Sequence, residues 1–336
     1  MKQIVAFLVV CSIFISCSDK KRVVEEENLN FEILSIDDLM IGRPSGIMYN
    51  DSKIILSDMQ GDSLFHLINL KERTSCQVGK RGNGPNEFLD FDSFYRSGEQ
   101  FGFFDSNLNS LIEMTFSDND VLFSKKVSVD SLHYRIVATA FDTYIGVGPY
   151  TKGLFSLLDA KGKHVKKIGE QPYRDSNERR IPELARAMAY QGKLSVSPDG
   201  CYLVHAIYST PMISFYRLQP QNIEEIGEDI IAYPVYKSEL GKKSYASAMS
   251  RHNKLGFMDV VPTDRHIYAI LSNRTIVESG LSAFLGNIIM KYDWNGNLVK
   301  KYVCNYDLMN ICITPDEKTL YAVGLVDEYE LLKADL

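Results

Sequence analysis

The sequence has little of what several protein classes require. It contains one Trp and six Cys in 336 residues, and it has one long apolar run, close to the N-terminus. A polytopic membrane protein needs several runs of about 20 apolar residues, so that class is excluded. The formal net charge is -6 with 24% charged residues, so we expect neither a basic nucleic-acid-binding protein nor a disordered chain.

Common catalytic and metal-binding motifs are also missing. The cysteines form no CxxC, the six His residues form neither HxH nor HExxH, and Gly-x-Ser-x-Gly does not occur. A zinc site and a nucleophile elbow are therefore disfavoured, and we predict a protein that is not an enzyme and has no metal or cofactor. We expect buried free thiols, with a Cys304–Cys312 disulfide as the alternative, at the four positions Cys76, Cys201, Cys304 and Cys312.

The apolar run has the features of an export signal. It extends from Ile4 to Ile15 behind a basic residue, which is too short to span a bilayer and fits a signal-peptide core. It ends in Phe14-Ile15-Ser16-Cys17, which resembles a bacterial lipobox and implies cleavage before Cys17 and diacylation of its thiol. An ordinary secretory signal is the alternative. We predict a signal peptide over residues 1–16, a flexible tether over 17–28 and a folded domain over 29–336.

Internal repeats indicate the architecture. Leu56–Leu64 aligns with Phe103–Leu111, and Asp159–Lys167 aligns with Asp293–Lys301 as a β-hairpin with Gly at its turn. Six polar turns, each expected to be of type I, precede short β-prone runs at intervals of 44 to 65 residues. The turn centres are residues 51, 98, 142, 199, 264 and 316.

This spacing is typical of propeller blades, so we predict an all-β fold: a six-bladed β-propeller with four-stranded antiparallel blades. The alternating segment Asn28–Ile36 precedes the first blade, and the last blade is one strand short. Pairing these two would satisfy two exposed edges, so we expect it to close the ring. Two polar insertions, at residues 170–190 and 237–254, either carry function or are simply long loops, and the first is helix-capable from Pro182 onward.

The segment from Gly82 to Phe88 reads Gly-Asn-Gly-Pro-Asn-Glu-Phe and links the first two predicted blades. Together with the lipobox and the six repeats, it resembles the TolB-like six-bladed propeller lipoproteins of the bacterial envelope. The resemblance implies a lipid-anchored envelope protein, most simply of the outer membrane. It does not indicate a particular biochemical activity, because most members of the family have no assigned one. A phosphate-binding loop is disfavoured because the Gly-Lys-Ser/Thr ending is missing. We expect a tight crossover in which Phe88 fills the space between blades and Glu87 pairs locally.

Arginines recur just ahead of the predicted innermost strands, where the links between blades converge on one mouth of the channel. A cationic funnel there would favour an anionic ligand, whereas simple pairing of each Arg with a nearby carboxylate is the alternative. The candidate ligand-binding residues are Arg43, Arg81, Glu87, Arg135, Arg186 and Arg251.

We therefore predict a non-catalytic binding module, anchored by a lipid in the bacterial envelope, that recognises a protein or glycan partner at the channel mouth and does not bind nucleic acid. The alternative is a metal-dependent sugar lyase or a lactonase-like hydrolase, because propellers can gather Asp, Glu, Asn or His at that mouth. A set of metal ligands in the channel would favour the enzyme, and a charge-complementary rim would favour the binding module.

Overall fold

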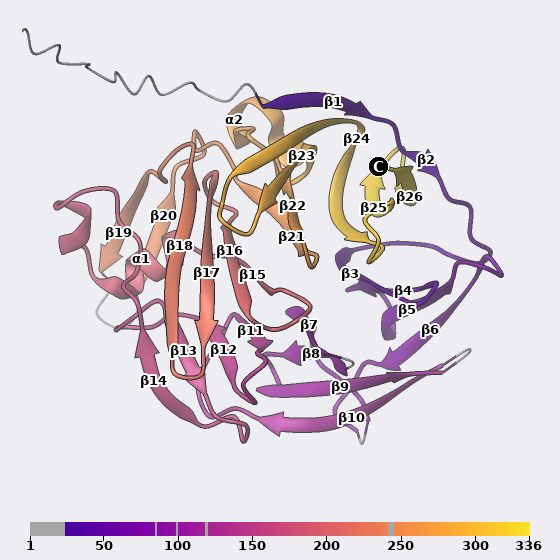
Figure 1. Cartoon of the computed structure of the whole chain (residues 1–336), viewed down its shortest axis with the longest axis horizontal. Helices are drawn as coiled ribbons and strands as arrows, with labels where there is room; N and C mark the ends of the chain where they lie inside the picture. Colours follow the sequence, from indigo (N-terminus) through magenta and orange to yellow (C-terminus); the bar gives the residue numbers. More distant parts are fainter. Residues whose placement is uncertain (1–23, 85, 99, 118–119, 241–244) are drawn as a thin grey trace, which may run out of the picture.

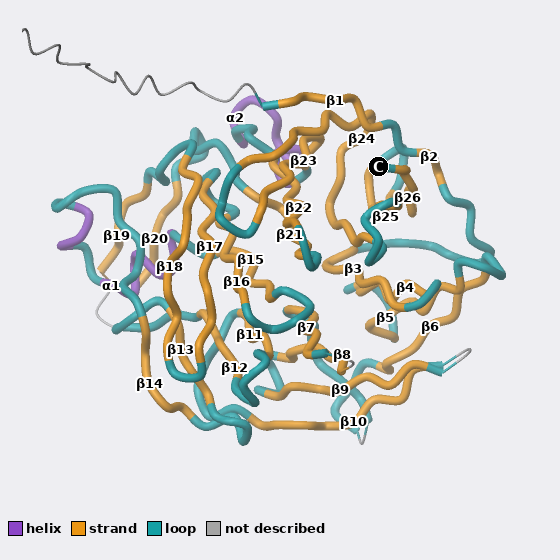
Figure 2. The backbone as a smooth tube through the Cα atoms, in the orientation of Figure 1, coloured by secondary structure: helices purple, strands orange, loops and turns teal. Residues whose placement is uncertain are grey.

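A computed structural model of the protein describes residues 24–336 except 85, 99, 118–119 and 241–244. The strands form small antiparallel sheets arranged radially about a central axis (Figure 1). The chain is almost entirely strand and loop, with helix confined to short segments (Figure 2). No helix in the described part has both the length and the apolar character needed to cross a membrane. The predicted signal peptide and Cys17 lie outside the described residues.

Each of the first four blades is a four-stranded sheet whose strands pair in chain order. The first blade contains β3 (Pro44–Asn50), β4 (Lys53–Asp58), β5 (Ser63–Asn69) and β6 (Thr74–Lys80). The second contains β7 (Ser93–Ser97), β8 (Gln100–Asp105), β9 (Ser110–Phe116) and β10 (Val121–Ser128). The third contains β11 (Arg135–Ala138), β12 (Tyr144–Val147), β13 (Phe155–Leu158) and β14 (His164–Ile168). The fourth contains β15 (Gly192–Val196), β16 (Tyr202–Ile207), β17 (Met212–Gln219) and β18 (Asn222–Ile230).

One long strand, β24 (Leu298–Ile313), joins the last two blades into a single sheet. Its first part is the outer strand of the fifth blade, and its second part is the inner strand of the sixth. The fifth blade also contains β21 (Phe257–Pro262), β22 (His266–Leu271) and β23 (Gly286–Asp293). The sixth also contains β25 (Thr319–Leu325), β26 (Tyr329–Asp335) and β2 (Glu32–Ile33). The predicted six-bladed propeller is confirmed.

The N-terminal segment closes the ring, as predicted, but it does so with two short strands. Strand β2 pairs with β26, placing Ile33 opposite Leu332. Strand β1 (Glu25–Leu29) adds to the outer edge of the fifth blade, parallel to β24, along the rim seen in Figure 1. The prediction of a flexible tether up to residue 28 is therefore wrong from Glu25 onward, because these residues form a strand. Three glutamates in β1 find partners on β24: Lys301 lies 2.7 Å from Glu26, and Lys300 pairs with Glu25 and Glu27.

The six predicted turns all lie between the innermost and second strands of their blades, on one face that we call the hairpin face. The turn at Ser197 has the predicted form, because the Gly200 N–H donates to the Ser197 carbonyl at 2.8 Å and Gly200 adopts φ +72°. The first turn differs from the expected type I, since Asp51 and Ser52 both have positive φ, as in type I′ hairpins. The links between blades lie on the opposite face, which we call the link face.

The aligned hairpins at residues 159–163 and 293–297 have the same geometry. Asp159 Oδ1 accepts from the Lys161 and Lys163 N–H groups, each at 2.9 Å. Asp293 Oδ1 accepts from the equivalent two N–H groups at 2.9 and 2.8 Å. Gly162 and Gly296 supply positive φ. The sequence repeat is therefore a structural repeat, because the same local hydrogen bonds fix both turns.

The core lies between neighbouring blades, so the middle strands are covered on both faces. This is why β4 and β8 are continuous apolar runs rather than alternating ones. Phe88 is buried between the first two blades, as predicted, with ring centroids 5.3 Å from Phe103 and 5.1 Å from Phe123. Close aromatic packing of this kind makes the blades a rigid platform for the inner strands.

The two insertions lie against the fourth blade. The first contains η1 (Glu178–Arg180) and α1 (Glu183–Ala189), which begins directly after Pro182 as predicted. The second contains the hairpin β19 (Tyr236–Leu240) and β20 (Tyr245–Met249). The Ser247 hydroxyl donates to the Ala185 carbonyl, so the two insertions contact each other. The fifth blade carries the short α2 (Ile276–Ser279) and η2 (Gly280–Phe284) on its β22–β23 connection.

Candidate functional site in the central channel

The innermost strands of all six blades surround one cavity, which we call the central cavity. Its volume is about 170 Å³, and β3, β7, β11, β15, β21 and β24 each contribute to its wall. Its wall includes the apolar side chains of Tyr49, Phe94 and Ile313, and Arg96 lines it next to the hairpin turn at residue 98. Because six different segments converge here, no short stretch of sequence contains the whole site.

The link-face end of the central cavity is charged. Arg135 Nη1 lies 3.4 Å from Asp92 Oδ1, and Lys193 Nζ lies 3.6 Å from Asp259 Oδ1. All four side chains line the cavity and are largely buried. We call these four residues the charged layer. They form two ion pairs, each between neighbouring blades, rather than a cluster of charges of one sign.

Burial dominates the electrostatics of the charged layer. It lowers the pKa of the Lys193 ammonium, an effect that the Asp259 carboxylate partly offsets and the Arg135 charge reinforces. Burial also raises the pKa of Asp92, although its bonds to Ser106 and the charge of Arg135 oppose the change. The charges of Lys193 and Asp92 are thus incompletely compensated by their partners, so a polar or charged ligand group entering the cavity would gain from pairing with them.

Backbone bulges help to place the polar side chains of this layer. The pairing register shifts between Phe257 and Asp259 on β21 and between Leu308 and Asn310 on β24. Asp259 Oδ2 accepts from the Ile311 N–H at 3.1 Å and from Asn310 Nδ2 at 3.3 Å. A bulge rotates the side chains that follow it and commonly re-aims one into a site.

The sequence as a whole matches a known family. The model of the TolB-like 6-blade propeller-like family matches residues 24–317, which is most of the chain. The chain belongs to the TolB-like six-bladed propeller family. The suspected resemblance is confirmed, and the family supports the fold described above.

Solved structures resemble the chain in fold over nearly its whole length. A Bacteroides fragilis protein named as exported has TM-score 0.54 at 11% identity, with 92% of this chain and 98% of that one covered. Agrobacterium tumefaciens regucalcin, described as a calcium-binding protein, has TM-score 0.52 at 11% identity, with 92% and 95% covered. The Myceliophthora thermophila Cps50 propeller domain has TM-score 0.50 at 12% identity, with 91% and 99% covered. A search of curated proteins returned no significant match.

Among the six predicted ligand-binding side chains, all of them described, Arg135 is the one that lines the central cavity of this TolB-like propeller. Arg43 and Arg251 are exposed on the link face. Glu87 accepts from Lys80 Nζ at 2.7 Å and from the Gly84 N–H at 2.8 Å, which confirms its predicted local pairing. Arg81 leads into the same crossover, and its Nε and Nη2 are buried without a hydrogen-bond partner.

Arg186 is a structural residue of the first insertion rather than a channel residue. Its side chain is 2% exposed and donates to the carbonyls of Gln171 and Ile181. It also lies 3.7 Å from Glu170 and 3.8 Å from Glu183. The expectation that Arg186 faces the channel mouth is wrong, because the insertion folds around its guanidinium.

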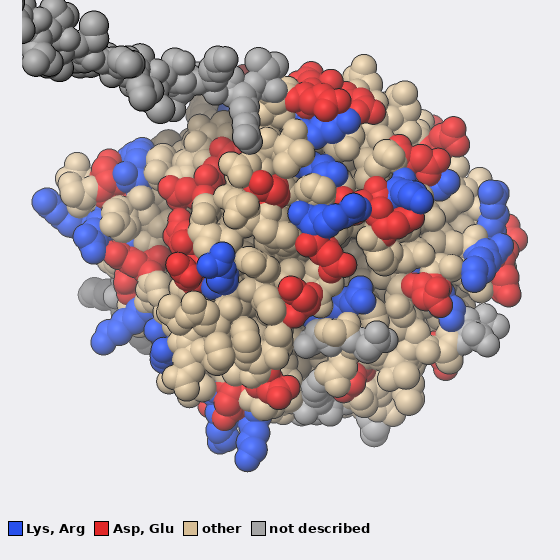
Figure 3. All heavy atoms as spheres, viewed as in Figure 1, with Lys and Arg blue, Asp and Glu red and all other residues tan. Residues whose placement is uncertain are grey.

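The charged side chains also fail to form a basic ring on the visible surface. On the face drawn in Figure 3, the Lys and Arg side chains of the described residues are interspersed with Asp and Glu. Asp92, Lys193 and Asp259 line the central cavity but were not among the predicted site residues. A signal for two of them existed: Lys193 and Asp259 are single charges inside otherwise apolar or small-residue innermost strands.

The paired aspartates of the first sequence repeat hold the chain as it enters a blade. Asp58 accepts from the N–H groups of Gly42, Arg43 and Gln60 at 2.7 to 2.9 Å. Burial raises the pKa of Asp58, but these three bonds outweigh it and the pKa is lowered. Asp105 accepts from the Leu89 N–H at 2.8 Å in the same way. These carboxylates therefore cap backbone turns.

The histidines and cysteines are dispersed as well. Within the described residues, no three His, Cys, Asp or Glu side chains are grouped so that they could hold a metal ion. Cys304 and Cys312 are buried free thiols, and burial raises the pKa of Cys304 to about 12. Cys76 is exposed and Cys201 partly exposed, so the expectation of burial is wrong for these two. Cys76 lies on β6, the outer strand of the first blade, and Cys201 lies in the turn between β15 and β16 on the hairpin face.

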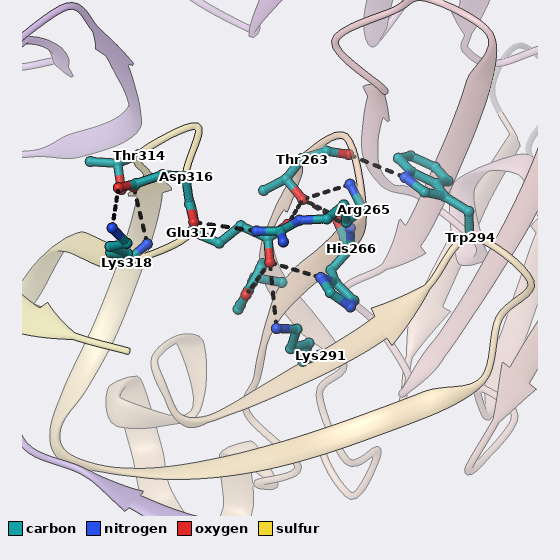
Figure 4. A network of polar contacts seen from close by, with 10 residues as sticks. Thr263, Arg265, His266, Lys291, Trp294, Thr314, Asp316, Glu317 and Lys318 are labelled. Atoms are coloured by element: carbon teal, nitrogen blue, oxygen red, sulfur yellow. Dashed lines mark hydrogen bonds and ion pairs between the residues drawn. The ribbon is translucent and has the colours of Figure 1, made fainter.

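A dense polar network joins the last two blades around Glu317 (Figure 4). The Glu317 carboxylate is 4% exposed and accepts from His266 Nδ1 at 2.7 Å and from the Tyr268 hydroxyl at 3.1 Å. Thr263 donates to it as well, and Lys291 Nζ lies 3.5 Å away. Because every donor comes from the fifth blade and the carboxylate comes from the sixth, the network fixes one blade against the next.

Proposed function

We propose that this protein is a non-catalytic binding module, lipid-anchored through Cys17 in the bacterial envelope, most simply on the outer membrane. Its central cavity receives a small group presented by a protein or glycan partner. The observation that carries the proposal is the cavity itself, in which all six innermost strands combine an apolar wall with the charged layer. Rigid sites with a few placed polar groups are typical of ligand recognition.

The size of the cavity supports recognition of a part of a larger partner. Pockets for drug-sized ligands measure roughly 300–1,000 Å³. The central cavity, at about 170 Å³, suits one side chain or one sugar ring. The apolar wall would contact the body of that group, and Lys193 or Asp259 would pair with its polar end.

The metal-dependent alternative lacks a specific observation in its favour. The likeness to regucalcin, at 11% identity, concerns the fold. The described channel residues pair their carboxylates with Arg135 and Lys193 instead of gathering them around one point. A cavity built from ion pairs suits binding, and the proposal therefore stays non-catalytic.

The test combines capture with a cavity-filling variant. Envelope extracts and a glycan array are probed with the purified wild type and two variants. In Ser195→Leu, the added side-chain atoms would occupy the central cavity. Ser124→Leu is the matched control, because Ser124 is exposed on β10. We expect Ser195→Leu to lose the captured partner and Ser124→Leu to retain it. Capture that is equal for all three proteins would contradict the proposal. Capture from the extract or on the array tells whether the partner is a protein or a glycan.

Lipid attachment is tested separately. Wild type and Cys17→Ser are produced with a radiolabelled fatty acid, and membranes are separated from soluble fractions. We expect label and membrane association in the wild type and loss of both in the variant. A labelled Cys17→Ser protein would refute the assignment of the anchor.

A further inference from the structure

A second cavity lies on the link-face side of the charged layer, and we call it the side cavity. Its volume is about 270 Å³, and it lies between the third and fourth blades. It shares Asp92 and Arg135 with the central cavity, but its other walls are different. Gln171, Ala187 and Tyr190 of the first insertion form one side of it.

The insertion is built as a fixed wall rather than a loose loop. Glu178 is 5% exposed, and both its carboxylate oxygens accept from the Tyr190 hydroxyl at 3.1 Å. Its Oε2 also accepts from the Arg174 N–H at 2.6 Å. Together with the buried Arg186, these bonds fix the fold of the insertion, and Ala189 and Tyr190 pack against Ile207 and Met212 of the fourth blade. The side cavity therefore has a defined shape.

One polar atom at the side cavity has no partner among the described residues: Arg135 Nε is buried and makes no hydrogen bond. The ring of His205, on β16, also lines the side cavity, and this residue is 3% exposed. Leaving a buried polar group unpaired is unfavourable, which makes the Arg135 guanidinium a candidate contact for a ligand.

Apart from Arg135 and Asp92, the polar side chains that line the side cavity are neutral. Burial lowers the pKa of His205 to about 4, so its imidazole is uncharged at neutral pH and can donate from one nitrogen and accept at the other. The Tyr208 hydroxyl donates to Gln191 Oε1 at 2.6 Å. The amide nitrogen of Gln191 therefore points away from Tyr208 and can donate to a ligand. The rings of Tyr134 and Tyr208 add aromatic surface to the wall.

The charge balance limits the ligand to a single negative charge. Among the residues that the structure describes, Arg135 is the one cation that lines the side cavity, and Asp92 lies 3.4 Å from its Nη1. A second negative charge, as on a phosphate monoester, would be repelled by Asp92 without another cation to balance it. A single carboxylate beside the Arg135 guanidinium fits this charge balance better.

We propose that the side cavity binds a monosaccharide-sized sugar acid, with its carboxylate on Arg135 and its hydroxyl groups on His205 and Gln191. The volume lies just below the range for drug-sized ligands, as a single sugar ring requires. The neutral donors and acceptors suit hydroxyl groups, and tyrosine rings pack against the apolar face of a sugar. This site is separate from the proposed central-cavity function and does not depend on it.

The test measures binding of D-glucuronate and D-galacturonate by ligand-observed NMR, beside D-glucose, D-galactose and D-glucose 6-phosphate. We expect one of the two uronates to bind at least about tenfold more tightly than its neutral hexose, which corresponds to about 1.4 kcal/mol. Arg135→Gln should remove this preference while leaving weak hexose binding. Ala187→Leu, which fills the cavity without removing a polar group, should weaken both by about tenfold or more.

Arg180→Gln is the matched control, because Arg180 is exposed on the outside of the same insertion. It should bind the uronate as the wild type does. Absence of saturable uronate binding up to about 10 mM would overturn the proposal. So would tighter binding of glucose 6-phosphate, or unchanged uronate binding in Ala187→Leu. Because Ser195→Leu tests the central cavity and Ala187→Leu the side cavity, either proposal can fail without the other.

Discussion

Replacing Glu317 by Gln should destabilise the propeller by removing the charge that joins the fifth and sixth blades. Burial raises the pKa of Glu317, but the hydrogen bonds from Thr263 and His266 outweigh it and bring the pKa to about 2, from an ordinary value of 4.5. That difference corresponds to about 3 kcal/mol of stabilisation by the ionised form. Glu317→Gln keeps the shape but loses the charge, so we expect the free energy of unfolding at pH 7 to fall by about 2–4 kcal/mol.

The pH dependence separates this explanation from a simple packing defect. The folded-state pKa of Glu317 is depressed, so its contribution is fully present above about pH 4.5 and is lost as the pH falls toward about 2. The stability difference between wild type and Glu317→Gln should therefore shrink over that window. Urea unfolding curves recorded at several pH values measure it.

The neighbouring exposed carboxylate supplies the control. Asp316 has a side chain that is 56% exposed, and Asp316→Asn should lower stability far less than Glu317→Gln. A Glu317→Gln loss below about 0.5 kcal/mol, or a difference that does not change with pH, would refute the assignment of Glu317 as the charged junction between these blades.

Two further predictions test the hairpin repeats and the ring closure. In Gly162→Ala, the new Cβ would lie 2.5 Å from the Ser128 carbonyl oxygen at φ +76°, so we expect the free energy of unfolding to fall by about 2 kcal/mol or more. In Gly98→Ala, where φ is +58° and the space is open, we expect it to fall by about 1 kcal/mol. Equal losses in thermal unfolding would show that φ alone matters. In the double variant Lys300→Glu and Lys301→Glu, three ion pairs to β1 become repulsive, so amide hydrogen exchange over residues 25–29 should speed up by about tenfold or more. Unchanged protection there, with β26 as the internal reference, would mean that backbone pairing alone holds β1.

The fold was predictable because its signals are local. The turns at residues 51, 98, 142, 199, 264 and 316 depend on nearby Asp, Pro and Gly residues, and each one lies where the spacing placed it. The hairpins beginning at Asp159 and Asp293 are determined in the same way, by side chains that bond the backbone two to four residues ahead. Ring closure followed from the general cost of exposed edges, but the attachment of β1 to the fifth blade required knowing that Lys300 lies at that edge.

The candidate site was much less predictable. Arg135 was found because it directly precedes an apolar run, yet the same pattern selected Arg43 and Arg251, which stay exposed. Arg186 was selected as a ligand-binding candidate because it lies in the polar insertion that precedes the fourth innermost strand. In the structure, those same polar residues enclose it.

The sequence by itself determined the number of blades, the positions of their turns, the buried role of Phe88 and the local pairing of Glu87. Each of these depends on groups close together along the chain. Only the tertiary structure decided which charges meet in the channel. Asp92, Arg135, Lys193 and Asp259 come from four different blades, and their pairing and desolvation arise from packing between segments up to 167 residues apart.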